Sequence, residues 1–143
     1  MKLYTDLKQS EKLTDILPLK SADMCYPLPC KDEDKPLLEQ GGFGCTPCWS
    51  LAALINILPA DWWDCNKHCF FEIYKQQDDK QDESSILYVV RYFYYKEEDL
   101  NNSNSKNLDF SRITRISTIG SNLIDACVRM IIELYEHKLL SIK

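Results

Sequence analysis

Residues 86–95 read Ile-Leu-Tyr-Val-Val-Arg-Tyr-Phe-Tyr-Tyr, and this run constrains the fold more than any other part of the chain. Its β-branched and aromatic residues predict a strand. Successive side chains of a strand point to opposite faces, so one face presents Ile86, Tyr88, Val90, Tyr92 and Tyr94, and the other presents Leu87, Val89, Arg91, Phe93 and Tyr95. An antiparallel strand with one solvated face alternates apolar with polar residues, and here only Arg91 is charged. Both faces of the predicted strand must therefore be buried, either by other parts of the chain or by a partner.

There are two alternatives for what buries the face that carries Arg91, Phe93 and Tyr95. The N-terminal segment and the residues that follow it can fold over this face. Alternatively, another protein, including a second copy of the chain, binds there. Tyrosine and arginine are enriched among the residues that dominate binding energy at protein interfaces. We therefore take Arg91, Phe93 and Tyr95 as interface candidates and expect either a protein partner or a homodimer.

Two further strands and a long helix are predicted from periodicity. Residues 69–75 predict a strand that forms an antiparallel hairpin with 86–95, and residues 110–117 predict a third strand. Residues 121–139 predict a helix, because apolar residues recur at spacings of three and four after Ser121 or Asn122, which can act as the N-cap. Each of these elements has an apolar face that must be buried against another element.

Two shorter helices are predicted in the first half of the chain. Residues 5–17 have apolar residues on one side and charges on the other, and Pro18 ends the pattern. Residues 47–58 are apolar over most of a helical surface, with Thr46 as the expected N-cap and Pro47 at the first helical position. The predicted fold is α+β: a small antiparallel sheet of two to three strands packed against two to three helices, in the order α-α-β-β-(β)-α.

The length of 143 residues fits a single domain over residues 1–143. Residues 18–46 hold four of the six prolines and three of the four glycines of the chain. Proline restricts the backbone and glycine loosens it, so this composition is typical of irregular structure. We therefore expect an irregular connector at about 18–46 between the first helix and the rest of the domain.

The net charge and the length of the apolar runs indicate whether the chain can bind nucleic acid or enter a membrane. The formal net charge is −5, which disfavours contact with a phosphate backbone. The order helix, three strands, helix is similar to that of double-stranded RNA-binding domains, but the start of the last predicted helix lacks the lysines with which those domains bind phosphates. No apolar run is long enough to span a bilayer, and charges interrupt the first nine residues. We expect a cytoplasmic protein that binds neither nucleic acid nor membrane.

The cysteines offer the main alternative reading. Cys45 and Cys48 have the Cys-x-x-Cys spacing, and Cys65, His68 and Cys69 follow at a distance along the chain that allows a tetrahedral zinc site. The competing interpretation is that these are free buried thiols, because cysteine is among the most buried residue types. A thiol nucleophile activated at a helix start is a third reading, but no buried strand precedes Cys45 as it does in thioredoxin-like folds.

Three strings of the sequence stand out: 21–26 (Ser-Ala-Asp-Met-Cys-Tyr), 46–54 (Thr-Pro-Cys-Trp-Ser-Leu-Ala-Ala-Leu) and 122–127 (Asn-Leu-Ile-Asp-Ala-Cys). In this order they resemble segments of a group of short uncharacterised proteins of gut anaerobic bacteria, often encoded in phage-derived DNA. The resemblance implies a phage or mobile-element setting. It implies no activity, cofactor or catalytic residue.

These observations favour a non-catalytic intracellular accessory or adaptor protein of phage origin that acts through protein–protein contacts. We expect no catalytic residues and no cofactor. The alternative is a small zinc-binding module that uses Cys45, Cys48, Cys65 and either Cys69 or His68. An enzyme with a cysteine nucleophile is the third hypothesis.

Overall fold

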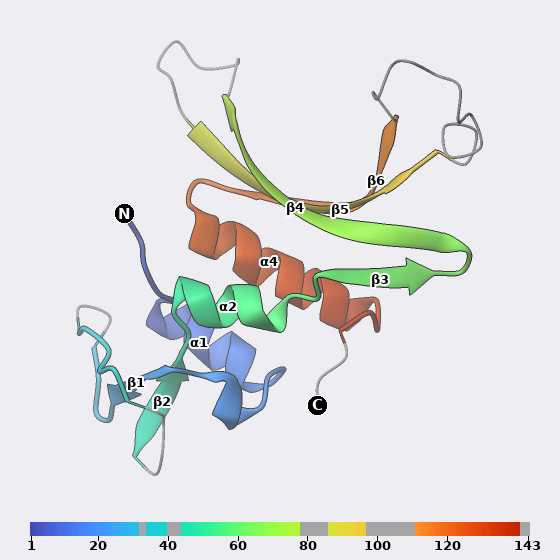
Figure 1. The fold of residues 1–143 in the computed structure, drawn as a ribbon. Helices are drawn as coiled ribbons and strands as arrows, with labels where there is room; N and C mark the ends of the chain where they lie inside the picture. The colour runs from blue at the N-terminus through green and yellow to red at the C-terminus, as the bar shows by residue number, and fades with distance from the viewer. Residues whose placement is uncertain (32–33, 40–43, 78–85, 97–110, 141–143) are drawn as a thin grey trace.

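The computed structural model describes residues 1–31, 34–39, 44–77, 86–96 and 111–140. Within these ranges it contains a four-stranded antiparallel sheet, a separate two-stranded antiparallel sheet and three α-helices. Figure 1 shows the helices between the two sheets. The predicted α+β class is confirmed. The prediction of a single sheet of two to three strands is wrong, because three short strands escaped the periodicity analysis.

The larger sheet has the strand order β3-β4-β5-β6. Strands β4 (Lys67–Gln77) and β5 (Ile86–Tyr95) form the predicted antiparallel hairpin, in which Phe70 lies opposite Phe93. Strand β6 (Arg112–Gly120) pairs with β5 and confirms the third strand over 112–117, whereas position 110 lies outside the described residues. Strand β3 (Asp61–Asp64) has no counterpart among the predicted strands, because four residues carry too little periodicity to be recognised.

Helix α4 (Leu123–Glu136) covers one face of this sheet and confirms the helix predicted at 121–139. The Asn122 side chain caps it by accepting a hydrogen bond from the N–H of Asp125 at 2.9 Å. The turn from β6 into α4 requires glycine at 120, since a Cβ there would lie 2.7 Å from the backbone nitrogen of Ala126. The side chains that α4 buries include Ile124, Cys127, Val128, Ile131 and Leu134.

Helix α2 (Leu51–Ile57) begins four residues later than predicted and packs against α4. Its N-cap is Ser50, whose hydroxyl accepts from the N–H of Ala53, so the prediction of Thr46 as N-cap and Pro47 as first helical residue is wrong. Both residues lie in strand β2 (Cys45–Cys48), which pairs only with β1 (Met24–Pro27). A two-stranded sheet consists of edge strands, and an edge strand tolerates the missing N–H of proline.

Helix α1 (Leu7–Thr14) confirms the amphipathic helix predicted at 5–17, although it is shorter at both ends. Asp6 is the N-cap, and Gln9 returns a hydrogen bond to the backbone of Asp6, so the two residues form a capping box. Leu13 is fully buried against the main core. The helix contacts β2 and α4.

The described residues of the predicted irregular connector at 18–46 are more ordered than its composition indicates. It contains a 3₁₀ turn (Leu19–Ser21), all of β1, an isolated bridge between Cys25 and Leu37, and the start of β2. Tyr26 is buried, and its hydroxyl donates a 2.8 Å hydrogen bond to the carbonyl of Thr5. Proline is compatible with these short edge strands, so the high proline content does not exclude pairing.

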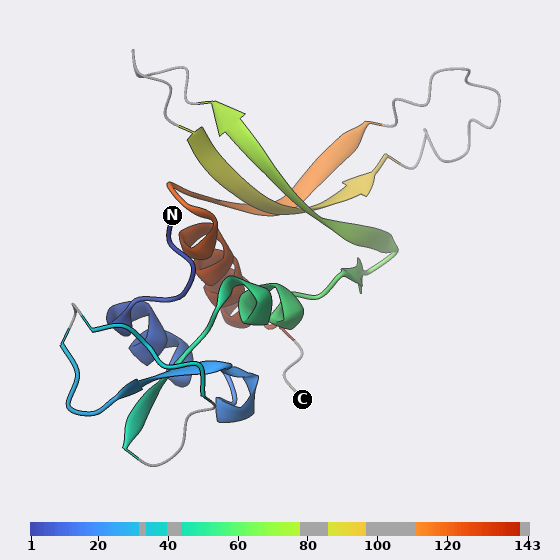
Figure 2. The same ribbon diagram turned by 60° about the vertical axis from the view of Figure 1, so that its left-hand side comes forward.

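The described part of the connector and α1 both lie on the α4 side of the larger sheet, as Figures 1 and 2 show. They therefore do not cover the face that carries Arg91, Phe93 and Tyr95. Of the two alternatives for this face, cover by these segments is not found for the residues that the structure describes. The reason is that the apolar stripe of α1 is used against α4 and the smaller sheet instead.

Candidate functional site

The candidate site is the face of the larger sheet that turns away from α4, here called the outer face. Phe71, Ile73, Tyr92 and Ile116 pack toward the core, so the residues that alternate with them point outward. Both ends of the sheet curve away from α4, which makes the outer face concave (Figures 1 and 2). Among the described residues, no helix or strand lies over it.

An aromatic row crosses the outer face from β3 to β5; it comprises Trp63, His68, Phe70, Phe93 and Tyr95. The Trp63 and His68 rings are stacked with their centroids 4.6 Å apart, and the Phe70 centroid lies 4.3 Å from that of His68. Phe70 then contacts Phe93 at 6.0 Å and Tyr95 at 5.8 Å. Trp63, at the end of the row, is 67% exposed, whereas Phe93 in the middle is only 6% exposed.

Beside the aromatic row lies a Glu72 triad, which consists of Glu72, Arg91 and Arg112. The Glu72 carboxylate accepts from Arg91 Nε at 2.6 Å and from an Arg112 terminal nitrogen at 2.8 Å. Both guanidinium groups also lie over the Phe93 ring, at 5.4 Å for Arg91 and 5.0 Å for Arg112. Two guanidinium groups share one carboxylate, so the triad carries one net positive charge. The arginines are held in place by both ion pairing and ring contact.

The structure thus brings together the three interface residues predicted from sequence, and it adds partners that sequence reasoning missed. Phe70 and Glu72 could have been found by extending the alternation of the 69–75 strand to its partner. Trp63 and Arg112 could not, because β3 is short and because the contact between Arg112 and Glu72 depends on the pairing of β4, β5 and β6.

The candidate zinc ligands of the alternative reading are not brought together. Cys45 and Cys48 lie in the smaller sheet, whereas Cys65, His68 and Cys69 lie in or beside β4 of the larger sheet. Within the larger sheet they also separate: Cys69 is buried toward the core, and His68 points to the outer face, where its Nε2 lies 2.7 Å from Asp61 Oδ2. In the described ranges, no group of three or more histidine, cysteine, aspartate or glutamate side chains is placed to hold a metal ion.

Several thiols have a raised pKa, which bears on the hypothesis of a cysteine nucleophile. Burial, with a further contribution from the neighbouring Cys45, raises the pKa of Cys25 to about 11. Burial alone raises the pKa of Cys127 to about 12, and burial also raises the pKa of Cys48 and Cys69. The thiolate is the nucleophile, so these four groups are held in the unreactive protonated form at neutral pH.

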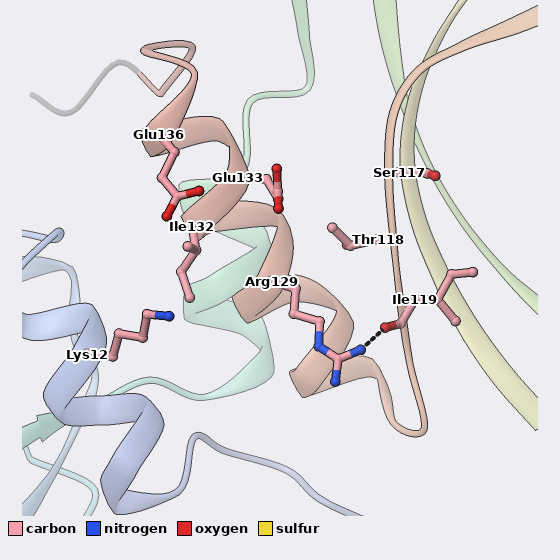
Figure 3. A pocket seen from close by; sticks show the side chains of 8 residues that line it. All are labelled: Lys12, Ser117, Thr118, Ile119, Arg129, Ile132, Glu133 and Glu136. Atoms are coloured by element: carbon pink, nitrogen blue, oxygen red, sulfur yellow. Dashed lines mark hydrogen bonds between the residues drawn. The ribbon is translucent and has the colours of Figure 1, made fainter.

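A second concave region lies between β6, α4 and α1 and has a volume of about 570 Å³ (Figure 3). Arg129 of α4 donates a hydrogen bond to the backbone carbonyl of Ile119 at one end of this groove, here called the α4–β6 groove. Glu133 and Glu136 lie further along α4, toward its C-terminal end. The complete lining is Lys12, Ser117, Thr118, Ile119, Arg129, Ile132, Glu133 and Glu136. This set contains no thiol or imidazole.

Comparisons with protein-family models, with curated proteins and with solved structures found no match to this chain. In the described part of the chain, no helix is long and apolar enough to cross a bilayer.

Proposed function

We propose that this protein is a non-catalytic adaptor that binds another protein through the outer face of its larger sheet. The single observation that carries the proposal is the aromatic row beside the Glu72 triad, on a concave face over which no described helix or strand lies. Tryptophan, tyrosine and arginine are the residue types most enriched among binding hot spots, and Trp63, Arg91 and Tyr95 supply all three.

The chemistry of the face defines the partner. Trp63 exposes most of its ring at one end of the aromatic row, which favours an apolar side chain of the partner there. The net positive charge of the Glu72 triad favours a carboxylate nearby, because a guanidinium group has five N–H donors and only some are used. A concave sheet accommodates the convex side of a helix, so we propose a partner helix with apolar and acidic side chains.

The same face is a poor match for nucleic acid. Glu72 neutralises one of the two arginines, and the chain as a whole has a formal net charge of −5. The central ring of the aromatic row, Phe93, is almost fully covered by its neighbours and has little free surface on which a base can stack. Because three strings of the sequence resemble segments of phage-associated proteins, we propose that the adaptor acts inside a bacterial host cell.

The proposal is tested by affinity purification from the native host with three versions of the tagged chain. The variant Trp63→Ser/Tyr95→Ser removes two rings of the outer face, and the control Leu38→Ser removes an 83% exposed leucine from the connector. We expect one or more proteins to co-purify with the wild type and with Leu38→Ser but not with the double variant. Capture of the same proteins by all three versions, or of none by any, contradicts the proposal.

The binding is then measured with the purified partner. Loss of two hot-spot rings is expected to raise the dissociation constant by about a thousandfold, because each hot-spot residue contributes about 2 kcal/mol or more and about 1.4 kcal/mol corresponds to a tenfold change. Circular dichroism spectra of the double variant and of the wild type must agree, so that lost binding is not lost folding.

A further inference from the structure

The outer face carries a second apolar row, on the far side of the Glu72 triad from the aromatic row. The strand register places Tyr74 opposite Val89 and Val89 opposite Ile119, so these three side chains cross β4, β5 and β6 in one line, here called the β4–β6 row. Their neighbours Ile73 and Val90 pack against the main core, so the row points outward. Figure 3 shows the Ile119 side chain pointing away from α4.

The β4–β6 row offers contact area mainly at its ends. Ile119 is 43% exposed and Tyr74 is half-buried, whereas Val89 between them is 2% exposed. The aromatic row has the same distribution, with an exposed Trp63 at its end and a covered Phe93 in its middle. Each row therefore has a well-packed centre and an accessible apolar end.

The Arg91 guanidinium lies between the two rows. Its central carbon is 5.0 Å from the centre of the Tyr74 ring and 5.4 Å from the centre of the Phe93 ring. Its Nε donates to Glu72, and a terminal nitrogen donates to the Thr114 hydroxyl at 3.3 Å. A guanidinium group has five N–H donors, so its contacts with the described residues leave donors for a ligand.

The spacing of the rows follows from strand geometry. Phe93 of the aromatic row and Val89 of the β4–β6 row both lie on β5, about 13 Å apart at about 3.3 Å per residue, and Arg91 lies midway. An α-helix rises about 1.5 Å per residue, so side chains about eight positions apart span about 12 Å. The residue midway between them lies on the same side of the helix. A helix laid along β5 can therefore contact both rows and Arg91 at once.

From this arrangement we infer that the partner of the proposed adaptor binds as a helix with one glutamate between two large apolar residues, about four positions from each. The apolar residues pack on the exposed ends of the two rows, and the carboxylate accepts from Arg91 and neutralises the net positive charge of the Glu72 triad. Glutamate is favoured over the shorter aspartate, because both ends of the sheet curve toward the partner and leave the triad at the bottom of the concave face (Figures 1 and 2). This inference rests on the proposed function and specifies the ligand of the outer face.

The probe for this inference is a fluorescein-labelled, alanine-rich helical peptide with the pattern Leu-x-x-x-Glu-x-x-x-Leu, in which x is alanine or glutamine. One matched peptide has glutamine in place of the glutamate, and a second exchanges the glutamate with the second leucine. We expect the glutamate peptide to bind the wild-type chain in fluorescence anisotropy with a dissociation constant of about 100 μM or tighter, the scale of a modest interface. Both matched peptides should bind about tenfold more weakly, because the charge-assisted hydrogen bonds to Arg91 are lost.

Two variants of the chain locate the contacts. Arg91→Gln should bind the glutamate and glutamine peptides within about twofold of each other, because the remaining Glu72 and Arg112 form a neutral pair. Ile119→Ser should raise the dissociation constant of the glutamate peptide about tenfold, because it removes the exposed end of the β4–β6 row. The control Ile86→Ser removes a similarly exposed isoleucine, 50% exposed, from the opposite face of β5 and should leave binding unchanged. Thermal melting of every variant establishes that each is folded.

Three results would overturn the inference: no binding of the glutamate peptide at up to about 200 μM protein, equal binding of the three peptides, or wild-type behaviour of Ile119→Ser and Arg91→Gln. These outcomes are distinct from the test of the adaptor function. A host protein that co-purifies with the wild type but not with Trp63→Ser/Tyr95→Ser, and that binds Ile119→Ser and Arg91→Gln as tightly as the wild type, supports the adaptor and rejects this helix pattern.

Discussion

Ile131 is the residue at which the packing of α4 on the larger sheet can be tested most directly. It is 0% exposed and lies in the main core, among residues from α4, α2 and the sheet. Ile131→Ala removes three buried carbon atoms, which corresponds to roughly 2.4 kcal/mol of transfer free energy at about 0.8 kcal/mol each. The cavity that remains adds to this loss, so we expect the free energy of unfolding to fall by about 2–5 kcal/mol.

A matched control separates burial from helix propensity. Ile55→Ala makes the same chemical change in helix α2 at a side chain that is 37% exposed. Alanine is the better helix former at both positions, so this gain cancels in the comparison. We expect Ile55→Ala to lower the free energy of unfolding by only about 1 kcal/mol. The Ile55 side chain is partly exposed, so its removal eliminates less buried apolar surface.

Urea unfolding followed by circular dichroism gives both free energies. The slope of the unfolding free energy against urea should be unchanged in both variants, so that the difference appears in the midpoint alone. A loss at Ile131 within about 0.5 kcal/mol, which is typical of a surface substitution, would refute the placement of α4 on the sheet. An equal loss at Ile55 and Ile131 would refute the difference in burial.

Three further predictions concern other parts of the molecule. Gly120→Ala places a Cβ about 2.7 Å from the backbone nitrogen of Ala126, so we expect a loss of about 1–3 kcal/mol in the same urea assay; an unchanged midpoint contradicts the close approach of β6 and α4. Burial alone would raise the pKa of Asp125, but hydrogen bonds from Lys2 and Gln9 outweigh it and lower the pKa below 3.8. A carboxyl whose pKa is lower in the folded state than in the unfolded state stabilises the fold above the unfolded-state pKa, and this stability is lost as pH falls through the folded-state pKa. The stability of the wild type should therefore fall more steeply below about pH 4 than that of Asp125→Asn. Parallel pH profiles of the two proteins would count against these hydrogen bonds. Finally, elemental analysis of the purified protein should find less than one zinc per chain, since the cysteine pairs lie in different sheets; one zinc per chain with unfolding on chelation reverses this expectation.

The accuracy of the sequence predictions varied with the length of the element. The strand at 86–95 and the helix at 121–139 were found because ten or more residues repeat one pattern, and both patterns survive in any tertiary arrangement. Strands β1, β2 and β3 have four residues each, and four residues are compatible with several conformations. Their structure depends on pairing with residues far along the chain.

The error at 47–58 has the same origin. Thr46 and Pro47 are favoured at a helix start and are also tolerated in an edge strand, so local preference does not distinguish the two. Pairing of β2 with β1 places Thr46 and Pro47 in a strand, and the helix then begins after Ser50, whose hydroxyl caps it. The alternative of a zinc site is not supported for a related reason, because spacing along the chain brings ligands together only if both segments join the same sheet.

The sequence by itself determined that this chain has two apolar strand faces, a hairpin and an amphipathic C-terminal helix, because these follow from residue type and periodicity. It also marked Arg91, Phe93 and Tyr95 as sharing one face, since alternation along a strand is local. Only the tertiary structure decided which face α4 covers and that Trp63 and Arg112 join the other face. Those contacts depend on strand register and helix docking, which are set by the free energy of burying the whole core rather than by any one segment.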